Sequence, residues 1–392
     1  MFLSSHERRG CRLAVILAMT SVIGCGGDSG GESPSRSQLW PQDQWIEQAP
    51  EEQGMDGPTL EGARSYAFAD GKHTQGVVIV RGGALVAEWY ADGSGPESWA
   101  TSWSVAKSFT SVLIGIAIDE GLIPGVDVSM ADYIPEWRGT DTEAITLRDV
   151  LTMSSGLGWT EDYTDLGSDV AHLAARVSEP IPFVVGHSLT AQPGTFFNYS
   201  SGDTMLLSAV IEAATGMSAA EFAEERLFGP LGFRRAEWWS DIAGHSLTYC
   251  CLDSTSRDFA RFGLLLLRRG RWSDRQVVSE SWVEDSITPS RAYVGYGYQW
   301  WLLGRDTPSL PADTYAAIGV DGQYVYVIPS LDLVVVRSGR YTKYDGPAVA
   351  DPILFALLLS GGLIPTRGTR PPDEWSDEAF LGRIVDSIID ED

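Results

Sequence analysis

The stretch Thr101-Ser102-Trp103-Ser104-Val105-Ala106-Lys107-Ser108-Phe109-Thr110 decides the fold expected for this chain. It holds an S-x-x-K pair, Ser104 and Lys107, at the start of an apolar run in which Lys107 is the only charged residue as far as Ile118. A helix that is apolar on nearly every face is normally buried on all sides, and lysine is rarely buried without a partner. The stretch therefore predicts a core helix that carries one amine for a chemical reason.

The spacing of this pair suggests a nucleophile and its base. Residues three apart share one face of a helix, so the Ser104 hydroxyl and the Lys107 amine can meet. Serine is a poor nucleophile until a base removes its proton, and burial and the helix dipole both lower the pKa of a lysine. Free N–H groups in a first helical turn can stabilise an oxyanion. The alternative is a serine N-cap followed by a lysine that extends along the surface to water.

Length, charge and motif content narrow the classes of function. The chain has 392 residues, of which 44% are hydrophobic, enough for one large domain or two closely packed ones. Its formal net charge of −25 argues against nucleic acid as a partner and against a basic membrane-surface module. Because neither H-E-x-x-H nor C-x-x-C occurs, we expect no metal, and we expect no organic cofactor.

Residues 1–24 are typical of a signal peptide. Three arginines precede the apolar segment 13–19, which is too short to span a bilayer stably. The segment ends in Val22-Ile23-Gly24-Cys25, which resembles a bacterial lipobox, and we expect a lipid anchor on Cys25. Residues 25–41 predict a flexible tether, and the protein is expected on the periplasmic or cell-surface side of a bacterial membrane. An ordinary cleaved secretory signal is the alternative.

Two of the four cysteines are neighbours in the sequence, Cys250 and Cys251. The Cα atoms of adjacent residues are closer than ordinary disulfide geometry prefers. We therefore expect these two cysteines to be free and to pack as small apolar side chains.

Strand patterns occur at both ends of the chain, with a helical block between them. Two β-rich runs flank Gly82-Gly83 and predict a hairpin over 76–90. Three further strands are expected late in the chain, at 315–319, 323–328 and 333–337. Helices are expected at 104–121, 146–153, 205–214, 219–227, 256–270, 349–359 and around 381–388.

This order predicts an α+β fold in which an antiparallel sheet is flanked by N- and C-terminal helices and a helical lobe is inserted. The expected parts are a first α/β segment at 42–121, a helical lobe at 122–245 and a second α/β segment at 246–392. A site would lie in the groove between the lobes.

Two other stretches are candidates for the site. Tyr199 stands in the polar loop 192–202, and a phenol beside a lysine cation can have its pKa lowered and transfer protons. The stretch 319–323, Gly-Val-Asp-Gly-Gln, lies between two expected strands, where glycines let a backbone approach a ligand. The alternatives are a packed tyrosine and a plain hairpin turn.

Together these motifs resemble those of the penicillin-recognising serine hydrolases, a superfamily that includes class C β-lactamases, D-Ala-D-Ala carboxypeptidases and related esterases. Within it the likeness is greatest to 6-aminohexanoate-dimer hydrolases, and it extends from about residue 50 to 365. The stretches that carry this likeness are Ser104–Ser111, Leu151–Leu157, Ser256–Gly263 and Gly322-Gln323. The resemblance implies the β-lactamase/transpeptidase-like fold.

The resemblance also implies roles for individual residues. Ser104 would be the acylated nucleophile, and Lys107 would take its proton or tune Tyr199. Tyr199 would act as general base and then as acid at the leaving group. The oxyanion would be held by the backbone N–H groups of Ser104 and Gln323.

Three residues are implied as substrate contacts, namely Tyr163, Ser201 and Gly322. The sequence departs from the family pattern at two places near these residues. Ser201 replaces the Asn common in Y-x-N, and Val320-Asp321-Gly322 stands where many members carry Lys-Thr-Gly. The missing cation and the added aspartate would disfavour a substrate carboxylate.

We therefore expect a secreted serine hydrolase that cleaves a small-molecule ester or amide. A β-lactamase or D-Ala-D-Ala carboxypeptidase is one alternative, and a catalytically silent lipoprotein binding module is another. An α/β-hydrolase is disfavoured because no G-x-S-x-G elbow lies between a strand and a helix.

Overall fold

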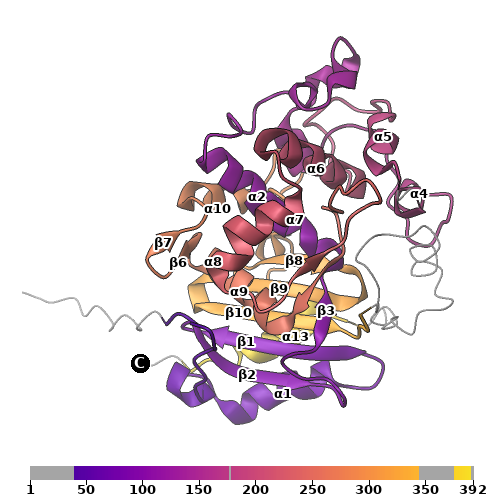
Figure 1. The fold of residues 1–392 in the computed structure, drawn as a ribbon. Coiled ribbons are helices and arrows are strands. Elements are labelled where there is room, and N and C mark those ends of the chain that lie inside the picture. The colour runs from indigo at the N-terminus through magenta and orange to yellow at the C-terminus, as the bar shows by residue number, and fades with distance from the viewer. Residues whose placement is uncertain (1–38, 176–177, 344–374, 390–392) are drawn as a thin grey trace, which may run out of the picture. The chain divides into compact units, whose positions relative to one another are not determined.

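The computed structural model describes residues 39–175, 178–343 and 375–389 (Figure 1). The described chain belongs to one compact unit that begins at Gln38. The predicted signal peptide, the lipidated Cys25, most of the tether and the helix expected at 349–359 lie outside the described residues. In the described part, no single helix has both the length and the apolar character to cross a membrane, while the bent pair Ser201–Thr215 and Ala219–Leu231 passes that test by length and composition alone.

A five-stranded antiparallel sheet forms the centre of the fold, in the order β2-β1-β10-β9-β8 (Figure 1). In the register of the two central strands, Ile79 of β1 lies opposite Val335 of β10. The first and last parts of the chain thus pair directly, which confirms the predicted α+β fold with its antiparallel sheet. The bounds are β1 Thr74–Arg81, β2 Ala84–Tyr90, β8 Tyr315–Gly319, β9 Gln323–Ile328 and β10 Leu333–Gly339.

Both predicted hairpins form. In the first, Gly83 has a φ of 84°, and a Cβ there would lie 1.9 Å from the carbonyl oxygen of Leu39. Only glycine fits both the left-handed backbone and the close approach. The second hairpin turns through Pro329–Leu331 and Asp332, which has a φ of 49°.

Alternate residues of the sheet face two separate apolar cores. Val78 and Val80 belong to a core that includes helices α2 (Ala106–Asp119) and α9 (Ser256–Leu267), and the helical block also packs into it. Val77 and Ile79 point to the other face, where α1 (Gly57–Ala67) and α13 (Asp377–Val385) cover the sheet. This alternation follows from the two-residue period of a strand.

The remaining described helices and strands surround this centre. Three short strands form a second sheet in the order β3-β5-β4, which the sequence patterns did not predict. The helices are α3 Leu147–Leu151, α4 Asp169–Ala175, α5 Pro180–Val185, α6 Ser201–Thr215, α7 Ala219–Ala223, α8 Gly229–Leu231, α10 Glu280–Ser286 and α11 Leu303–Asp306. The short strands are β3 Trp99–Thr101, β4 Glu237–Trp238, β5 Leu252–Thr255, β6 Arg271–Trp272 and β7 Arg275–Gln276.

Helix α2 is the buried core helix that the sequence predicted. Every residue from Ala106 to Ala117 is buried, and the ring of Phe109 stacks on that of Phe262 in α9 with centroids 3.6 Å apart. The helix ends at Asp119, and Gly121, two residues later, has a φ of 73°. Ser104 lies just before the helix, in the 3-10 turn η2 (Trp103–Val105).

Two other predicted helices differ in detail. Helix α6 begins at Ser201 rather than at Met205, because Ser200 is its N-cap and accepts a hydrogen bond from the N–H of Asp203. The helix expected over 219–227 is divided, since α7 ends at Ala223 and a π-helical turn continues to Phe228.

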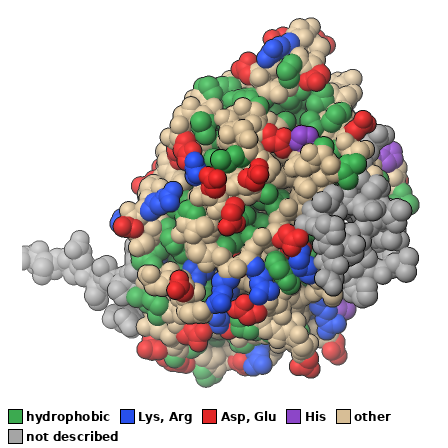
Figure 2. Space-filling model, viewed as in Figure 1, with side chains coloured by type: hydrophobic (Ala, Val, Ile, Leu, Met, Phe, Trp, Pro, Cys, Tyr) green, Lys and Arg blue, Asp and Glu red, His purple; other side chains and the backbone are tan. Residues whose placement is uncertain are grey.

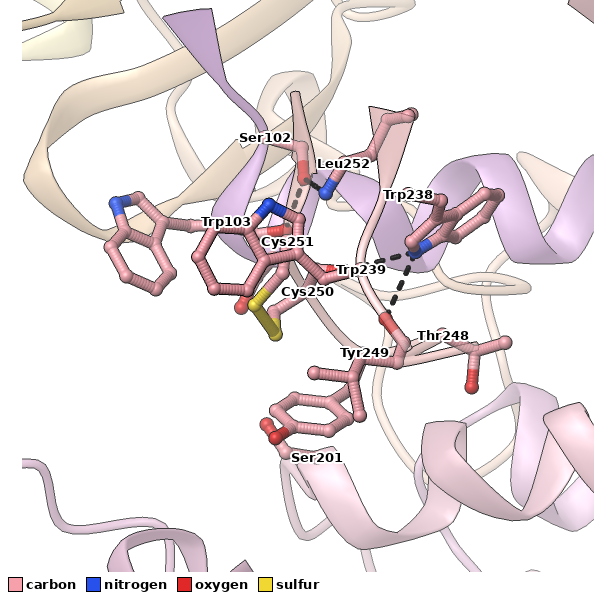
Figure 3. Close-up of a disulfide and its surroundings, with 12 residues drawn as sticks. Ser102, Trp103, Ser201, Trp238, Trp239, Thr248, Tyr249, Cys250, Cys251 and Leu252 are labelled. Atoms are coloured by element: carbon pink, nitrogen blue, oxygen red, sulfur yellow. Dashed lines mark hydrogen bonds between the residues drawn. A yellow bond between two sulfur atoms is a disulfide. The ribbon is translucent and has the colours of Figure 1, made fainter. Parts of the chain in front are cut away.

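The prediction of free thiols at Cys250 and Cys251 is wrong, because the two side chains form a disulfide (Figure 3). Their Cα atoms are 3.7 Å apart, the spacing of any adjacent pair. Cys251 has a φ of 67°, a left-handed turn of the main chain that the spacing argument did not consider.

The negative charge is spread rather than gathered on the face of the molecule that Figure 2 shows. On the face shown in Figure 2, Asp and Glu side chains are scattered, with Lys and Arg side chains among them. This distribution agrees with a role of the net charge in solubility.

Candidate active site

Ser104 and Lys107 meet as the sequence predicted. The Lys107 side chain is only 1% exposed, and its Nζ lies 3.1 Å from Ser104 Oγ. Trp103, directly before the serine, has a φ of 41°, an uncommon conformation for a bulky residue. Such conformations concentrate at functional sites, where the surrounding structure holds them in place.

Three oxygen atoms surround the Lys107 amine. Besides Ser104 Oγ, they are Ser201 Oγ at 3.1 Å and the main-chain oxygen of Tyr249 at 3.0 Å. The hydroxyl of Ser201 donates to Glu161 Oε1 at 2.5 Å, so its oxygen accepts from the lysine. The carbonyl of Tyr249 can only accept.

These partners direct the lone pair of the amine. A neutral lysine has two N–H donors and one lone pair, and the acceptors on Ser201 and Tyr249 take both donors. The lone pair is then left for the hydroxyl hydrogen of Ser104. The proton positions follow from the partners, and they place a base against a nucleophile.

The charge state of Lys107 is shifted in the direction that this chemistry needs. Burial lowers the pKa of Lys107 to about 8, while the nearby carboxylate of Glu161 acts in the opposite direction. The amine is therefore neutral in a large fraction of molecules at mildly alkaline pH. This confirms the predicted lowering.

Tyr199 is also brought to the site, where it lies beside Ser104 and Lys107. Its ring lies 5.1 Å from Lys107 Nζ and stacks on Trp301 with centroids 5.4 Å apart. The predicted lowering of its pKa is wrong, because burial raises the pKa of Tyr199 and Glu161 raises it further, although the Ser104 side chain lowers it. Tyr199 is thus a protonated phenol near neutral pH, and Lys107 is the better base.

Glu161 organises this site, and the sequence patterns did not identify it. Its carboxylate accepts from both the N–H (2.9 Å) and the hydroxyl (2.5 Å) of Ser201. It also accepts from Trp159 Nε1 at 2.5 Å and from the hydroxyl of Tyr163 at 2.6 Å. The only sequence signal was the spacing of Trp159, Glu161 and Tyr163, which stand two residues apart in one loop.

Tyr163 and Ser201, both predicted as substrate contacts, reach the site by different routes. Tyr163 is 44% exposed and its hydroxyl donates to Glu161, so it lies at the entrance. Ser201 is buried and lies between Lys107 and Glu161. A substrate could touch Tyr163 without rearrangement, whereas Ser201 is already occupied by protein groups.

The third motif lies at the end of β8, beside Ser104. A Cβ built on Gly319 would lie 3.1 Å from the nitrogen of Ser104 and 2.4 Å from the oxygen of Ser102. Gly319 therefore permits this close approach.

The register of β8 decides which N–H groups face outward. Ala316 exchanges main-chain hydrogen bonds with Trp301, and Gly319 pairs with Gln323 on the other side, in β9. Because C=O and N–H of one trans peptide point in opposite directions, the N–H of Val320 points away from β9. The N–H of Gln323 points into the ladder toward Gly319, which argues against its predicted role at the oxyanion.

Gly322 and the side chain of Gln323 are held within the fold. The carbonyl of Gly322 accepts from Arg337 Nη1 at 2.6 Å, and Gln323 Oε1 accepts from the N–H of Gly339 at 3.2 Å. Both residues shape the β8–β9 turn. Among the described residues, no group of three or more His, Cys, Asp and Glu side chains could hold a metal ion.

Comparison with known proteins finds hydrolases that are similar in sequence. The chain is 28% identical to a 6-aminohexanoate-dimer hydrolase of Paenarthrobacter ureafaciens over 295 residues, which cover 69% of this chain and 74% of that protein. It is 31% identical to a D-aminopeptidase of Cereibacter sphaeroides over 146 residues, 35% of this chain and 26% of that enzyme.

The fold has solved relatives as well. A Bacillus anthracis structure, provisionally assigned as a 6-aminohexanoate-dimer hydrolase, superposes with a TM-score of 0.61 at 24% identity and covers 76% of this chain and 83% of its own. The family model described as Beta-lactamase matches residues 43–358. The chain therefore belongs to the Beta-lactamase family, whose members are serine hydrolases.

Proposed function

We propose that this protein hydrolyses an amide or ester bond of a small molecule through an acyl-enzyme on Ser104. One observation carries the proposal: the acceptors on Ser201 and Tyr249 take both N–H groups of a neutral Lys107, so its lone pair is left for Ser104. Without these two acceptors, the lone pair of the buried amine would not be directed at the serine hydroxyl.

The reaction then proceeds in balanced steps. Ser104 Oγ forms a bond to the substrate carbonyl carbon as its proton passes to Lys107. The N–H groups of Ser104 and Val320 would hold the oxyanion, in place of the predicted pair with Gln323. When the intermediate collapses, the leaving group takes a proton from the Tyr199 hydroxyl, which regains one from Lys107. Water then attacks the acyl-enzyme by the reverse proton route and frees Ser104.

A linear amide is the favoured substrate class. The curated relatives named above are an amide-dimer hydrolase and an aminopeptidase, and both names denote cleavage of amide bonds. The residues of β8 that precede Gly319, Ala316-Ala317-Ile318, carry no cation, and the Glu161 carboxylate lies next to the site. Both features oppose a substrate carboxylate, so β-lactamase and carboxypeptidase activities are the weaker alternatives.

The test is labelling with a fluorophosphonate probe together with turnover of short acyl esters, linear amides and nitrocefin. Wild type should be labelled, and Ser104→Ala should lose labelling and turnover by roughly a thousandfold or more. Ser111→Ala is a matched control, because Ser111 is buried in the same helix and its hydroxyl has no hydrogen-bond partner among the described residues.

The outcomes separate the alternatives. Turnover of nitrocefin above that of linear amides would favour a β-lactamase. Absence of labelling and of turnover in the wild type would overturn the hydrolase proposal in favour of a silent binding module. Equal labelling of Ser104→Ala and wild type would remove Ser104 as the nucleophile.

We also propose that the protein is exported and anchored by a lipid on Cys25. The signal-like residues 1–24 support this location, and so does the Cys250–Cys251 disulfide, because disulfides persist mainly in oxidising compartments. Membrane fractionation of cells with wild type and Cys25→Ser tests it. Wild type should sediment with membranes and carry the lipid mass on its first residue, and an unmodified Cys25 in a soluble fraction would overturn the anchor.

A further inference from the structure

The segment 248–252 is tied to the surrounding structure by every one of its carbonyl groups. Five successive carbonyl oxygens accept hydrogen bonds at 2.8 to 3.0 Å, from Thr110 Oγ1, Lys107 Nζ, Trp238 Nε1, Trp239 N and Ser102 N in that order. The second of them is the carbonyl of Tyr249, the acceptor for the lysine. The position of this acceptor therefore depends on the path of the main chain through the segment.

The Cys250–Cys251 disulfide lies in the middle of this segment (Figure 3). Each cysteine is 4% exposed, and Figure 3 shows the rings of Trp239 and Tyr249 on either side of the sulfurs. With Cys251 at a φ of 67°, the chain turns at the bridge, and the carbonyls on its two sides reach different partners.

We propose that the Cys250–Cys251 disulfide is a positioning element for the active site, because it holds the main chain so that the Tyr249 carbonyl accepts from Lys107. This inference rests on the proposed function. The bridge acts through Tyr249 and touches neither the substrate nor the reacting atoms. Reduction would free the two cysteines to rotate and would remove the fixed acceptor.

A general stabilising role does not account for the bridge equally well. The stabilisation from a disulfide grows with the length of the loop that it closes, and two adjacent residues close almost no loop. The main consequence of this bridge is therefore local, in the directions of the carbonyls beside it. Because Lys107 donates directly to the carbonyl of Tyr249, next to the bridge, a change in the direction of that carbonyl would affect catalysis.

The first experiment reduces the native protein with a dithiol. Two electrons and two protons pass to the Cys250–Cys251 bond and give two thiols, while the dithiol closes to its own disulfide. Thiol titration under native conditions counts the reduced bridge. We expect kcat to fall by about tenfold to a hundredfold with little change in KM, and reoxidation to restore it.

Variants keep the test decisive if the buried bridge resists the reductant. The double variant Cys250→Ser/Cys251→Ser should turn over as slowly as the reduced protein and should not respond to dithiol. Ser111→Ala, which keeps the bridge, should lose activity on reduction as wild type does. Near-UV circular dichroism and thermal melting confirm that each variant is folded.

The pH profile separates positioning from a loss of folded protein. The titratable groups that face Lys107 are Glu161, Tyr199 and Tyr249. A carbonyl that accepts from the ammonium favours the charged form, so its loss should move the acid limb of kcat/KM to lower pH while the maximum falls. A loss of folded molecules would lower the maximum and leave the limb in place.

Each outcome bears on one proposal. If oxidised wild type is not labelled by the fluorophosphonate probe, the proposed function fails before the bridge is tested. If it is labelled, and the folded double variant turns over at the wild-type rate with the same pH profile, the positioning role is overturned while the hydrolase proposal stands.

Discussion

At the scale of single residues, the site depends on keeping Lys107 close to a carboxylate without pairing it directly. Ser201 lies between the amine and Glu161 and hydrogen-bonds both. A direct ion pair with the carboxylate would keep the lysine charged. With a hydroxyl between them, the carboxylate is farther away and stabilises the charged amine less. Burial therefore dominates, and it lowers the pKa of Lys107 to about 8.

This balance predicts the pH dependence of catalysis. The reaction needs the neutral amine, so kcat/KM should rise with pH through about 8 in the wild type. Glu161 favours the charged amine, and Glu161→Gln should therefore move this limb to lower pH and also reduce kcat by disturbing Ser201. Glu143→Gln, on the surface, is the control. A limb that stays in place or moves to higher pH would contradict the assigned field of Glu161.

A second residue-scale prediction concerns stability. The folded-state pKa of Lys107, about 8, lies below the ordinary value of 10.5, so the unfolded chain binds more protons between these pH values. The burial penalty is complete below pH 8, and stability should recover as pH rises toward 10.5. Lys107→Met should thus abolish turnover yet raise the free energy of unfolding at pH 7 by about 1–3 kcal/mol.

Urea denaturation at pH 7 and at pH 10.5 measures this effect. The gain of Lys107→Met over wild type should shrink at the higher pH, where the folded amine is neutral and about half of the unfolded amines are neutral as well. A variant that is less stable than wild type at both values would show that the hydrogen bonds of the amine outweigh its desolvation.

At the scale of elements, the site forms where the turn before α2 meets the end of β8. Ser104 comes from η2, and Gly319 closes β8 against it without a side chain. The N–H of Val320 is directed outward by the same register that buries the N–H of Gln323. The alignment of one strand with one turn thus determines which donors meet at the nucleophile.

Gly319→Ala tests this contact. The added Cβ would lie 2.4 Å from the Ser102 oxygen, a main-chain atom, so β8 and η2 must separate. We expect kcat to fall by roughly a hundredfold, with a smaller change in KM. Gly62→Ala, in α1, is the matched control, because a Cβ there has no atom within 4 Å and helix propensity should add about 0.5–1 kcal/mol of stability. Normal turnover in folded Gly319→Ala would refute the close-contact argument.

At the scale of the whole molecule, the active site and a purely structural core lie on opposite faces of the central sheet. One core contains α2, α9 and the helical block, while the other contains α1 and α13. The second core includes Phe380, which is fully buried and packs against the rings of Tyr66, Tyr326 and Trp375. None of these rings touches Ser104 or Lys107.

Phe380→Ala should therefore destabilise the protein by about 3–5 kcal/mol and leave kcat per labelled active site unchanged. Chemical denaturation gives the first quantity, and active-site titration with the fluorophosphonate probe gives the second. Ile389→Ala, where the side chain is 51% exposed, should change stability by less than about 0.5 kcal/mol. A lower kcat per labelled site would mean that the two cores are coupled.

The sequence by itself determined the features that depend on local spacing. Ser104 and Lys107 are one helical turn apart, and strand alternation at both ends of the chain predicts the antiparallel sheet. Tyr199 was also identified, because the motif that contains it resembles a motif of the penicillin-recognising serine hydrolases. These features are encoded within a few neighbouring residues, so they can be predicted without knowledge of the packing.

Only the tertiary structure decided the features that depend on distant residues. Ser201 reaches Lys107 from 94 positions away and Tyr249 from 142, and Glu161 acts through the first of them. The pKa of Tyr199 rises because the fold buries it beside a carboxylate, the reverse of the local expectation. The outward N–H of Val320 and the bridge at Cys250 likewise follow from strand register and from a left-handed main-chain turn, neither of which residue types alone can specify.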